Sequence, residues 1–578
     1  MLPILVALFS SAVLAASPVV ETPYGPVEGF EYALEDGKTA NIFLGIPYAK
    51  PPVGELRFEH PQKLPKWKDV LQEKEFTASC VQHHRRASEI QVPGEVFAED
   101  CLSLNVMAPA EKAPDANGYP VFVFIHGGGF EFGSSRFYGY KNISENFVSE
   151  GIVFVTLNYR LSALGFFSTG DHVIPGNLGL WDQTLALHFI QEVIEGFGGD
   201  PARVTIWGES AGGASVSSLT HSPHSNYLFQ QAIAMSGSVY APWATHEETV
   251  AHSGRLATAL GCVGTSTEVH DCMKTKSVDE LLDGIDEIGA ATEDFVGLLF
   301  SPRMDGDFFP FDLEKLLQSA PKIPFITGVT DTEGGFLSMF THLDFMTRTG
   351  VPSAKWATYS DKDLENYISE KVVEGDKYGR AGEALKSKIE DYYVNRPNDD
   401  GSALTATNYL ERLTQLFSDV YFNIPPLQEA RAKSALDTPA YLYIEEYHNP
   451  VTVEGLPVKG SYHGNEIPYL FGVAFGSLFP FNDEDRAFQK NLLEAFVSFV
   501  KNGTPKVNGQ PWEPISASQP SKYMSFGPSS QMKDGYKKAS ADFWLNDISN
   551  NVDLELVKKL LLPEAKKIDL ESTEHGEL

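Results

Sequence analysis

The sequence predicts an α/β fold with a mostly parallel central sheet, helices on both faces and a helical insertion. Two continuous apolar runs, 119–125 and 151–159, have the composition of strands buried on both faces. Apolar residues then recur at helical spacing from Leu178 to Phe197, and an apolar run at 203–207 follows. Strands and helices that alternate in this way are typical of a parallel sheet.

Weaker patterns predict the remaining elements in chain order. They are short strands at 23–30 and 41–48, buried strands at 324–329 and 440–447, a long helix at 483–500 and an amphipathic stretch at 554–562. Residues 361–436 are charged and helical in pattern, and no linker rich in Gly, Ser or Pro delimits them. We therefore predict that they are an insertion within a single domain that spans 17–562.

The composition limits the classes of partner. The chain has 578 residues, of which 42% are hydrophobic, so it can bury a large core. Its formal net charge of −32 argues against nucleic acid and anionic lipid surfaces as partners. The sequence does not indicate an oligomeric state.

Both ends of the chain carry features of the secretory pathway. Residues 1–16 combine a short apolar core with small residues, which predicts a cleaved signal peptide. No later stretch has the apolar length of a transmembrane helix, so we predict no integral membrane span. The acidic tail, 563–578, ends in His-Gly-Glu-Leu, which resembles a lumenal retention signal except at Gly576. The predicted location is the endoplasmic reticulum lumen or the cell exterior.

Cysteines and sequons fit the same compartment. The four cysteines are Cys80, Cys101, Cys262 and Cys272. Three disulfide pairings are possible, and pairing between sequence neighbours would close two short loops. A zinc site is disfavoured because the chain contains no Cys-x-x-Cys pair. Two sequons, at Asn142 and Asn502, predict N-glycosylation, although Pro505 makes the second a poorer acceptor.

The run Gly208-Glu209-Ser210-Ala211-Gly212 has the pattern of a nucleophile elbow. A strand leads into it and a run of small residues that can start a helix follows it. In open α/β sheets the functional groups gather at the carboxyl ends of the strands. We therefore expect the partners of Ser210 at the carboxyl ends of the other predicted strands.

Three other strand ends supply the partners that a nucleophilic serine needs. The first run ends in consecutive glycines, so the amides of Gly128 and Gly129, with that of Ala211, can bind an oxyanion. The strand at 324–329 is followed by Asp331 and Glu333, either of which can orient a histidine. The candidate bases are His342, His448, His463 and His575. His221 and His224 are predicted to be solvated surface residues.

Seven motifs in order give the chain a wider resemblance. They are GIPYA at 45–49 with PPVG at 51–54, EDCLSLN at 99–105, HGGGF at 126–130, FGGDP at 197–201, GESAGG at 208–213, DTEG at 331–334 and HGNEIP at 463–468. On these motifs the chain resembles the type B carboxylesterase and cholinesterase family of α/β-hydrolases over nearly its whole length.

The resemblance implies specific roles for the candidate residues. It selects Glu333 as the acid and His463 as the base, with Ser210 as the nucleophile. It also implies the pairings Cys80–Cys101 and Cys262–Cys272. The reaction it implies is hydrolysis of a small-molecule carboxylic ester, with no metal and no organic cofactor. Glu209 resembles an acidic residue of the family that can help to stabilise the imidazolium. A purely structural role for Glu209 is the alternative.

Departures from the family pattern bear on the substrate. Cholinesterases of the family hold the choline group on a tryptophan in the first disulfide loop, and residues 81–100 contain no tryptophan. Acetyl-selective members carry aromatic residues where this chain has Val296 and Leu298, so we predict a wider aliphatic acyl pocket. A broad-specificity carboxylesterase is the resulting prediction. The alternatives are a cholinesterase-like or lipase-like esterase, and a non-catalytic binding protein similar to neuroligins.

Overall fold

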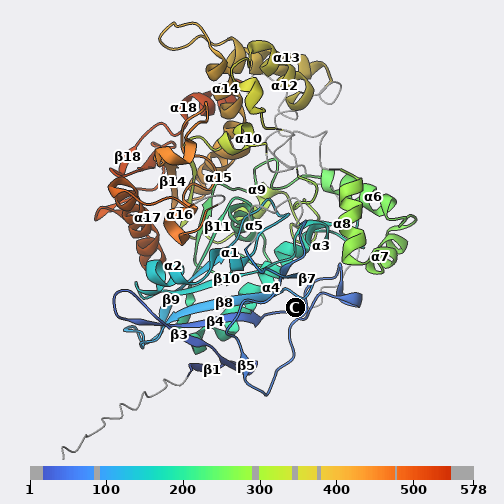
Figure 1. Ribbon diagram of the computed structural model, residues 1–578, viewed down its shortest axis with the longest axis vertical. Coiled ribbons are helices and arrows are strands. Elements are labelled where there is room, and N and C mark those ends of the chain that lie inside the picture. The colour runs from blue at the N-terminus through green and yellow to red at the C-terminus, as the bar shows by residue number, and fades with distance from the viewer. Residues whose placement is uncertain are drawn as a thin grey trace, which may run out of the picture.

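The computed structural model describes residues 17–83, 92–289, 298–341, 349–373, 379–474 and 478–548. An eleven-stranded sheet runs through the centre of this part of the chain (Figure 1). From one edge to the other its strands are β18 (Gln531–Lys533), β17 (Tyr523–Phe526), β14 (Ala440–Glu445), β13 (Phe325–Thr330), β12 (Gln231–Met235), β11 (Gly199–Glu209), β9 (Tyr119–Ile125), β10 (Val153–Leu157), β8 (Ser103–Pro109), β4 (Thr39–Pro47) and β3 (Phe30–Ala33).

The sheet is parallel in its middle and antiparallel at its edges. The run from β17 through β14, β13, β12, β11 and β9 to β10 is parallel throughout. Strands β8, β4 and β3 at one edge and β18 at the other pair antiparallel with their neighbours. The predicted α/β class is therefore confirmed, and the apolar run at 119–125 is strand β9.

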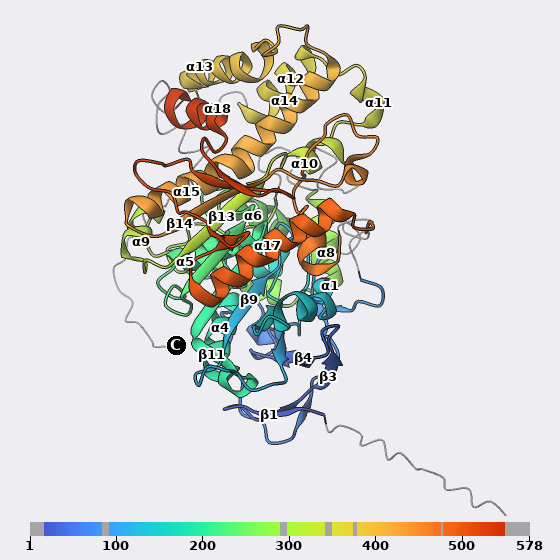
Figure 2. The same cartoon turned by 90° about the vertical axis from the view of Figure 1, so that its left-hand side faces the viewer.

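Alternating side chains of β9 build a hydrophobic core on each face of the sheet. Val121 and Val123 belong to one core, which also holds apolar residues of α4 (Leu178–Val193) and α5 (Ala211–His221). Phe122 and Phe124 belong to the other core, where Phe496 of α17 (Asp483–Asn502) packs. Figure 2 shows α17 running across this second face. Burial on both faces explains why this strand lacks polar residues.

The charged segment at 361–436 folds into helices, as predicted. They are α12 (Asp361–Tyr367), α13 (Gly379–Glu390), α14 (Ala406–Ser418) and α15 (Ile424–Ala435), with short π-helical turns between them. Figure 1 shows α12, α13 and α14 together at one end of the molecule. Helix α15 packs against β13 and β14, so the segment is joined to the central sheet.

One predicted N-terminal strand is two strands in the structure. The stretch at 23–30 forms β2 (Pro26–Glu28) and the start of β3, with a break at Gly29. A Cβ atom at Gly29 would lie 2.2 Å from the carbonyl oxygen of Ile42. The close approach of the neighbouring strand requires glycine there. Strand β2 instead joins β1 (Val19–Glu21) and β5 (Leu71–Gln72) in a separate small sheet.

Both disulfides have the pairing that the family resemblance implies. Cys80 bonds to Cys101 near the start of β8, and Cys262 after α6 (Glu248–Ala259) bonds to Cys272 in α7 (Ser266–Lys274). Helix α8 (Val278–Glu287) completes this group of helices.

Several sequence predictions concern the termini and the surface. The predicted signal peptide, the stretch at 554–562 and the acidic tail lie outside the described residues. Asn142 and Asn502 are both exposed, as acceptors of glycans must be. Within the described ranges, every helix is too short or too polar to cross a bilayer.

Candidate active site

Ser210 lies on a strained turn between β11 and α5. Its φ of 58° and ψ of −124° place it in a region that residues with side chains rarely adopt. The turn is tight because Gly208 and Gly212 pack closely: a Cβ atom at Gly208 would lie 2.3 Å from the carbonyl carbon of Gly212. The Ser210 amide donates a hydrogen bond to the carbonyl of Met235 at 2.8 Å. The residues with the sequence pattern of a nucleophile elbow thus form a tight, strained turn from strand to helix.

The glycine loop, residues 127–133, follows β9 and lies beside this elbow. Strands β9 and β11 are parallel neighbours, so their carboxyl ends lie at the same edge of the sheet. A Cβ atom at Gly127 would lie 3.0 Å from the Cβ atom of Ser210. Gly128 and Gly129 have φ angles of 107° and 59°, and a Cβ atom at Gly128 would lie 2.0 Å from the carbonyl oxygen of Phe132. Glycine is therefore required at this loop.

Glu333 and His463 meet at the same edge. Nδ1 of His463 lies 2.6 Å from Oε2 of Glu333, which is fully buried after β13. The other carboxylate oxygen of Glu333 accepts hydrogen bonds from the Thr330 amide, at 2.8 Å, and from the Ser236 hydroxyl. These contacts fix the carboxylate in one orientation toward the imidazole.

Asp331, the alternative acid, has a different task. Its Oδ1 accepts hydrogen bonds from the Ser461 amide and the Thr332 hydroxyl, both at 2.7 Å. Asp331 therefore holds the loop that precedes His463 and leaves the imidazole to Glu333. Of the rival bases, His342 and His575 lie outside the described residues, and His448 is half-buried.

Glu209 approaches the other nitrogen of His463. Its Oε1 lies 3.2 Å from Nε2, and its side chain is 1% exposed. Burial acts to lower the pKa of His463, but the charges of Glu209 and Glu333 outweigh it and raise this pKa to about 9. Burial raises the pKa of Glu209 to about 7. The site is therefore built to favour a positively charged imidazole.

Two aromatic rings enclose the imidazole. The ring of Phe336 stacks on His463 with centroids 4.6 Å apart and 20° between the planes, and the Phe422 centroid also lies 4.6 Å away. These rings limit the ring orientations of His463 and keep water from its faces.

Sequence reasoning missed three polar residues of this region. Ser236 follows β12, so the rule that polar groups gather at strand ends could have found it. Glu466 is buried in the HGNEIP motif and accepts a hydrogen bond from Tyr443 at 3.1 Å, and burial raises its pKa to about 8. Glu445 ends β14 and accepts from Asn465 at 2.6 Å. No local signal distinguished these carboxyls from surface residues.

Leu298 lies beside the glycine loop. A Cβ atom at Gly129 would lie 3.3 Å from Cδ2 of Leu298, and the Leu299 amide donates to Oε1 of Glu131 at 2.9 Å. The side chain of Leu298 therefore borders the space next to Gly129. Val296 lies outside the described residues.

The prediction for His221 is wrong. His221 is fully buried, and its Nδ1 lies 2.8 Å from the carbonyl oxygen of Ser217, one turn earlier in α5. Burial and the charge of Lys433 lower its pKa to about 3. The i, i+3 spacing with His224 did not reveal that α5 is covered on all sides. Across the described ranges, no group of three or more His, Cys, Asp or Glu residues could hold a metal ion.

The comparisons with known proteins agree with this geometry. Residues 16–544 match the model of the carboxylesterase family. Gut esterase 1 of Caenorhabditis briggsae is 36% identical over 540 residues, which cover 92% of this chain and 93% of that protein. Liver carboxylesterase of Sus scrofa is 32% identical over 581 residues, covering 94% and 96%. Cholinesterase of Mus musculus is 32% identical over 547 residues, covering 91% and 86%. The chain belongs to the carboxylesterase family and has the α/β-hydrolase fold.

Proposed function

We propose that this chain is a serine esterase that hydrolyses small-molecule carboxylic esters through an acyl-enzyme intermediate. One observation carries the proposal: His463 lies between Glu333 and Glu209 at the sheet edge where the Ser210 elbow meets the glycine loop. That arrangement supports a base that gains a proton during the reaction, next to donors for a developing oxyanion.

In the acylation step, Oγ of Ser210 attacks the ester carbonyl carbon while its proton passes to Nε2 of His463. The carbonyl oxygen gains the negative charge and accepts hydrogen bonds from the amides of Gly128, Gly129 and Ala211. Each such donor is worth about 3 kcal/mol of transition-state stabilisation. The tetrahedral intermediate then collapses, the carbon–oxygen bond to the alcohol breaks, and the alcohol leaves with the proton from His463.

In the deacylation step, water replaces the alcohol. His463 takes a proton from water, whose oxygen attacks the acyl carbon. Collapse of the second intermediate breaks the bond to Oγ of Ser210, which recovers the proton from His463. The product leaves as a carboxylic acid and then loses its remaining proton to solvent. Glu333 holds the imidazole in the required tautomer in both steps, and Glu209 offsets the imidazolium charge. No step requires a metal or an organic cofactor.

Broad acyl specificity is the finer part of the proposal. Leu298 beside Gly129 supports an aliphatic acyl pocket, and the first disulfide loop has no tryptophan for a quaternary ammonium group. We expect p-nitrophenyl butyrate to be hydrolysed faster than the acetate, and acetylthiocholine to be a poor substrate. Rapid turnover of acetylthiocholine would instead favour a cholinesterase.

A fluorophosphonate probe tests the proposed function directly. We expect one probe molecule per chain on Ser210, and no labelling of the variant Ser210→Ala. Circular dichroism on both proteins controls for folding. If the folded wild-type chain is not labelled, the esterase proposal is wrong and a non-catalytic binding protein is favoured.

The proposal includes a location in the secretory pathway. Disulfides persist in oxidising compartments, and this chain forms two of them. We expect expression with the N-terminal segment to give a glycosylated product whose glycans are lost in the variants Asn142→Gln and Asn502→Gln.

A further inference from the structure

The glycine loop, residues 127–133, is a closed turn. Its Gly128 carbonyl accepts hydrogen bonds from the amides of both Glu131 and Phe132, at 3.0 Å each. A Cβ atom at Gly133, where φ is 113°, would lie 2.7 Å from the carbonyl oxygen of Gly127. The last residue of the loop therefore packs directly on the first. Any displacement of Gly133 must move the residues that carry the oxyanion amides.

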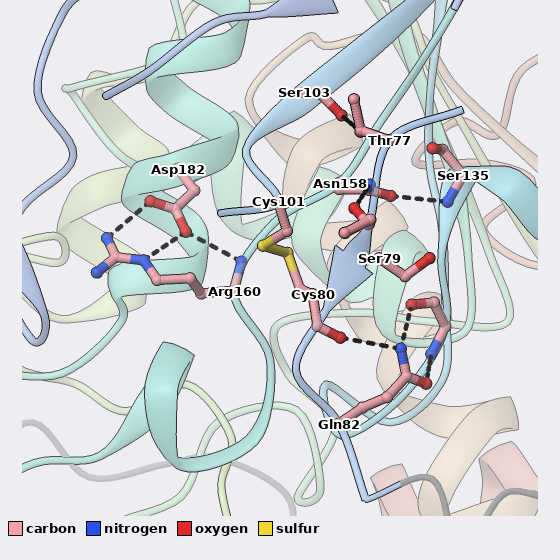
Figure 3. Close-up of a disulfide and its surroundings, with 12 residues drawn as sticks. Thr77, Ser79, Cys80, Gln82, Cys101, Ser103, Ser135, Asn158, Arg160 and Asp182 are labelled. Carbon is pink, nitrogen blue, oxygen red and sulfur yellow. Dashed lines mark hydrogen bonds and ion pairs between the residues drawn. A yellow bond between two sulfur atoms is a disulfide. The ribbon is translucent and has the colours of Figure 1, made fainter. Parts of the chain in front are cut away.

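The side chain of Gln82 holds Gly133 through both of its backbone polar groups. Oε1 of Gln82 accepts from the Gly133 amide at 2.9 Å, and Nε2 donates to the Gly133 carbonyl at 3.0 Å. Nε2 also donates to the carbonyl of Cys80 at 3.2 Å. Figure 3 shows the carboxamide of Gln82 next to the carbonyl of Cys80, near the Cys80–Cys101 disulfide. Gln82 is 5% exposed, so water does not compete for these hydrogen bonds.

Gln82 is itself fixed by the first disulfide. It follows Cys80 by two residues, and Cys80 is bonded to Cys101. The neighbouring Ser79 amide donates to the Val96 carbonyl at 2.8 Å. The chain after the glycine loop is anchored as well, because the Ser135 amide donates to Oδ1 of Asn158 at 2.9 Å. The carboxamide of Gln82 therefore starts from a rigid backbone.

We propose that Gln82 is a positioning residue of the oxyanion hole, which acts through Gly133 on the amides of Gly128 and Gly129. The inference rests on the proposed function and deepens it. Gln82 does not touch the reacting atoms, so it contributes to the transition state by keeping those donors in place before the charge develops. The Cys80–Cys101 disulfide gains a role in this way, because it supports the residue that holds the oxyanion loop.

The variant Gln82→Met tests the inference, because it keeps the side-chain volume and removes the three hydrogen bonds. Misplacement of a catalytic group by about 1 Å costs about 100-fold. We expect kcat for p-nitrophenyl butyrate to fall by about 10- to 100-fold, with KM changed by no more than about twofold. A trifluoromethyl ketone forms an oxyanion on the serine, so its inhibition constant should rise by the same factor as kcat falls.

Gln191→Met is the matched control. Gln191 is another partly buried glutamine that ties two backbone groups, the carbonyls of Pro201 and Leu228, at 2.8 and 2.9 Å. We expect Gln191→Met to lower the thermal midpoint without changing kcat or the inhibition constant. If Gln82→Met does not fold, we expect the same fall in kcat and rise in the inhibition constant for Gln82→Asn. The asparagine side chain is shorter by one methylene group, so its carboxamide lies farther from Gly133.

The outcomes separate this inference from the proposed function. A Gln82 variant whose kcat and inhibition constant stay within twofold of wild type overturns the inference alone. The same holds if its kcat falls only in proportion to the folded fraction. A folded wild-type chain that a fluorophosphonate does not label overturns the proposed function and this inference together.

Discussion

At the scale of single residues, the charge balance around His463 governs the proposed chemistry. One carboxylate, Glu333, touches Nδ1, and a second, Glu209, touches Nε2, the nitrogen that must accept the serine proton. Two neighbouring negative charges favour the imidazolium in the transition state. They also favour it in the resting enzyme, where a protonated histidine cannot act as a base. The same contacts therefore accelerate the reaction and restrict it to higher pH.

The variant Glu209→Gln should separate these two effects. His463 must be neutral to act as the base, so kcat/KM falls as pH drops through its pKa, which Glu209 helps to raise to about 9. Removal of one charge should move the acidic limb of the pH profile down by about one pH unit. The maximal kcat should fall by about tenfold, because the imidazolium loses a partner.

The control for this profile is Glu73→Gln. Burial also raises the pKa of Glu73 to about 7, so its carboxyl titrates in the same range, but it lies at Gly45 in the N-terminal part of the sheet. We expect the Glu73 variant to leave the acidic limb in place. A Glu209 variant with an unshifted limb would show that Glu209 does not set the pKa of His463.

The variant Leu298→Phe should narrow the acyl pocket. Leu298 lies beside Gly129, so a larger ring there takes space from the acyl chain. We expect the ratio of kcat/KM for p-nitrophenyl butyrate to that for the acetate to fall by about tenfold or more. Hydrolysis of the acetate by the same variant is the internal control for a working triad. An unchanged ratio would mean that Leu298 does not contact the acyl group.

At the scale of elements, the elbow depends on close backbone contacts between neighbouring strand ends. The loop after β12 packs on the elbow, and a Cβ atom at Gly237 would lie 2.2 Å from the carbonyl oxygen of Ser210. Gly237 therefore lets the loop after β12 pack closely on the elbow, just as Gly208 and Gly212 allow close packing within the elbow. The strain at Ser210 persists because these neighbours leave the turn no room to relax.

The variant Gly237→Ala should therefore damage the site as well as the fold. We expect a loss of about 2 kcal/mol or more in the free energy of unfolding and slower labelling by a fluorophosphonate. Gly254→Ala in α6 is the control, because its added Cβ atom would have no neighbour within 4 Å other than the adjacent residues and the backbone of its own helix. That change should stabilise the helix by about 1 kcal/mol and leave labelling unchanged. Equal effects of the two variants would contradict this account of the elbow.

At the scale of the whole molecule, the two disulfides have different relations to the site. Cys80–Cys101 lies next to Gln82 and the glycine loop, whereas Cys262–Cys272 joins α6 to α7 in a group of helices at the flank seen in Figure 1. Both restrict the unfolded chain, and a short loop of this kind contributes about 2–3 kcal/mol. The first disulfide also supports Gln82, whose side chain contacts Gly133 of the glycine loop.

Removal of the second disulfide should affect stability alone. For the double variant Cys262→Ser with Cys272→Ser we expect a lower thermal midpoint, from a loss of about 2–3 kcal/mol, and an unchanged kcat/KM for p-nitrophenyl acetate well below that midpoint. Thermal unfolding followed by circular dichroism, with activity measured on the same sample, checks both. A fall in kcat/KM for the folded variant would connect this flank to the site.

The sequence by itself determined the features that depend on local patterns. Continuous apolar runs identified the buried strands, and the glycines around Ser210 identified the elbow, because a tight turn leaves a signature within a few residues. The fold class followed from the alternation of strands and helices. For the acid and the base, however, the residues alone left Asp331 or Glu333 and several histidines. Only the family resemblance selected a pair, and the structure brings that pair into contact.

Tertiary structure decided which polar residues meet. The order of β9, β11, β12 and β13 brings Ser236 to Glu333, and the disulfide loop brings Gln82 to Gly133, although these partners are far apart in the chain. Tertiary packing also buries His221 and Glu466. The sequence does not distinguish a buried polar residue from an exposed one. Local patterns record backbone geometry, whereas the contacts and dielectric surroundings of a charged group arise only when distant segments pack together.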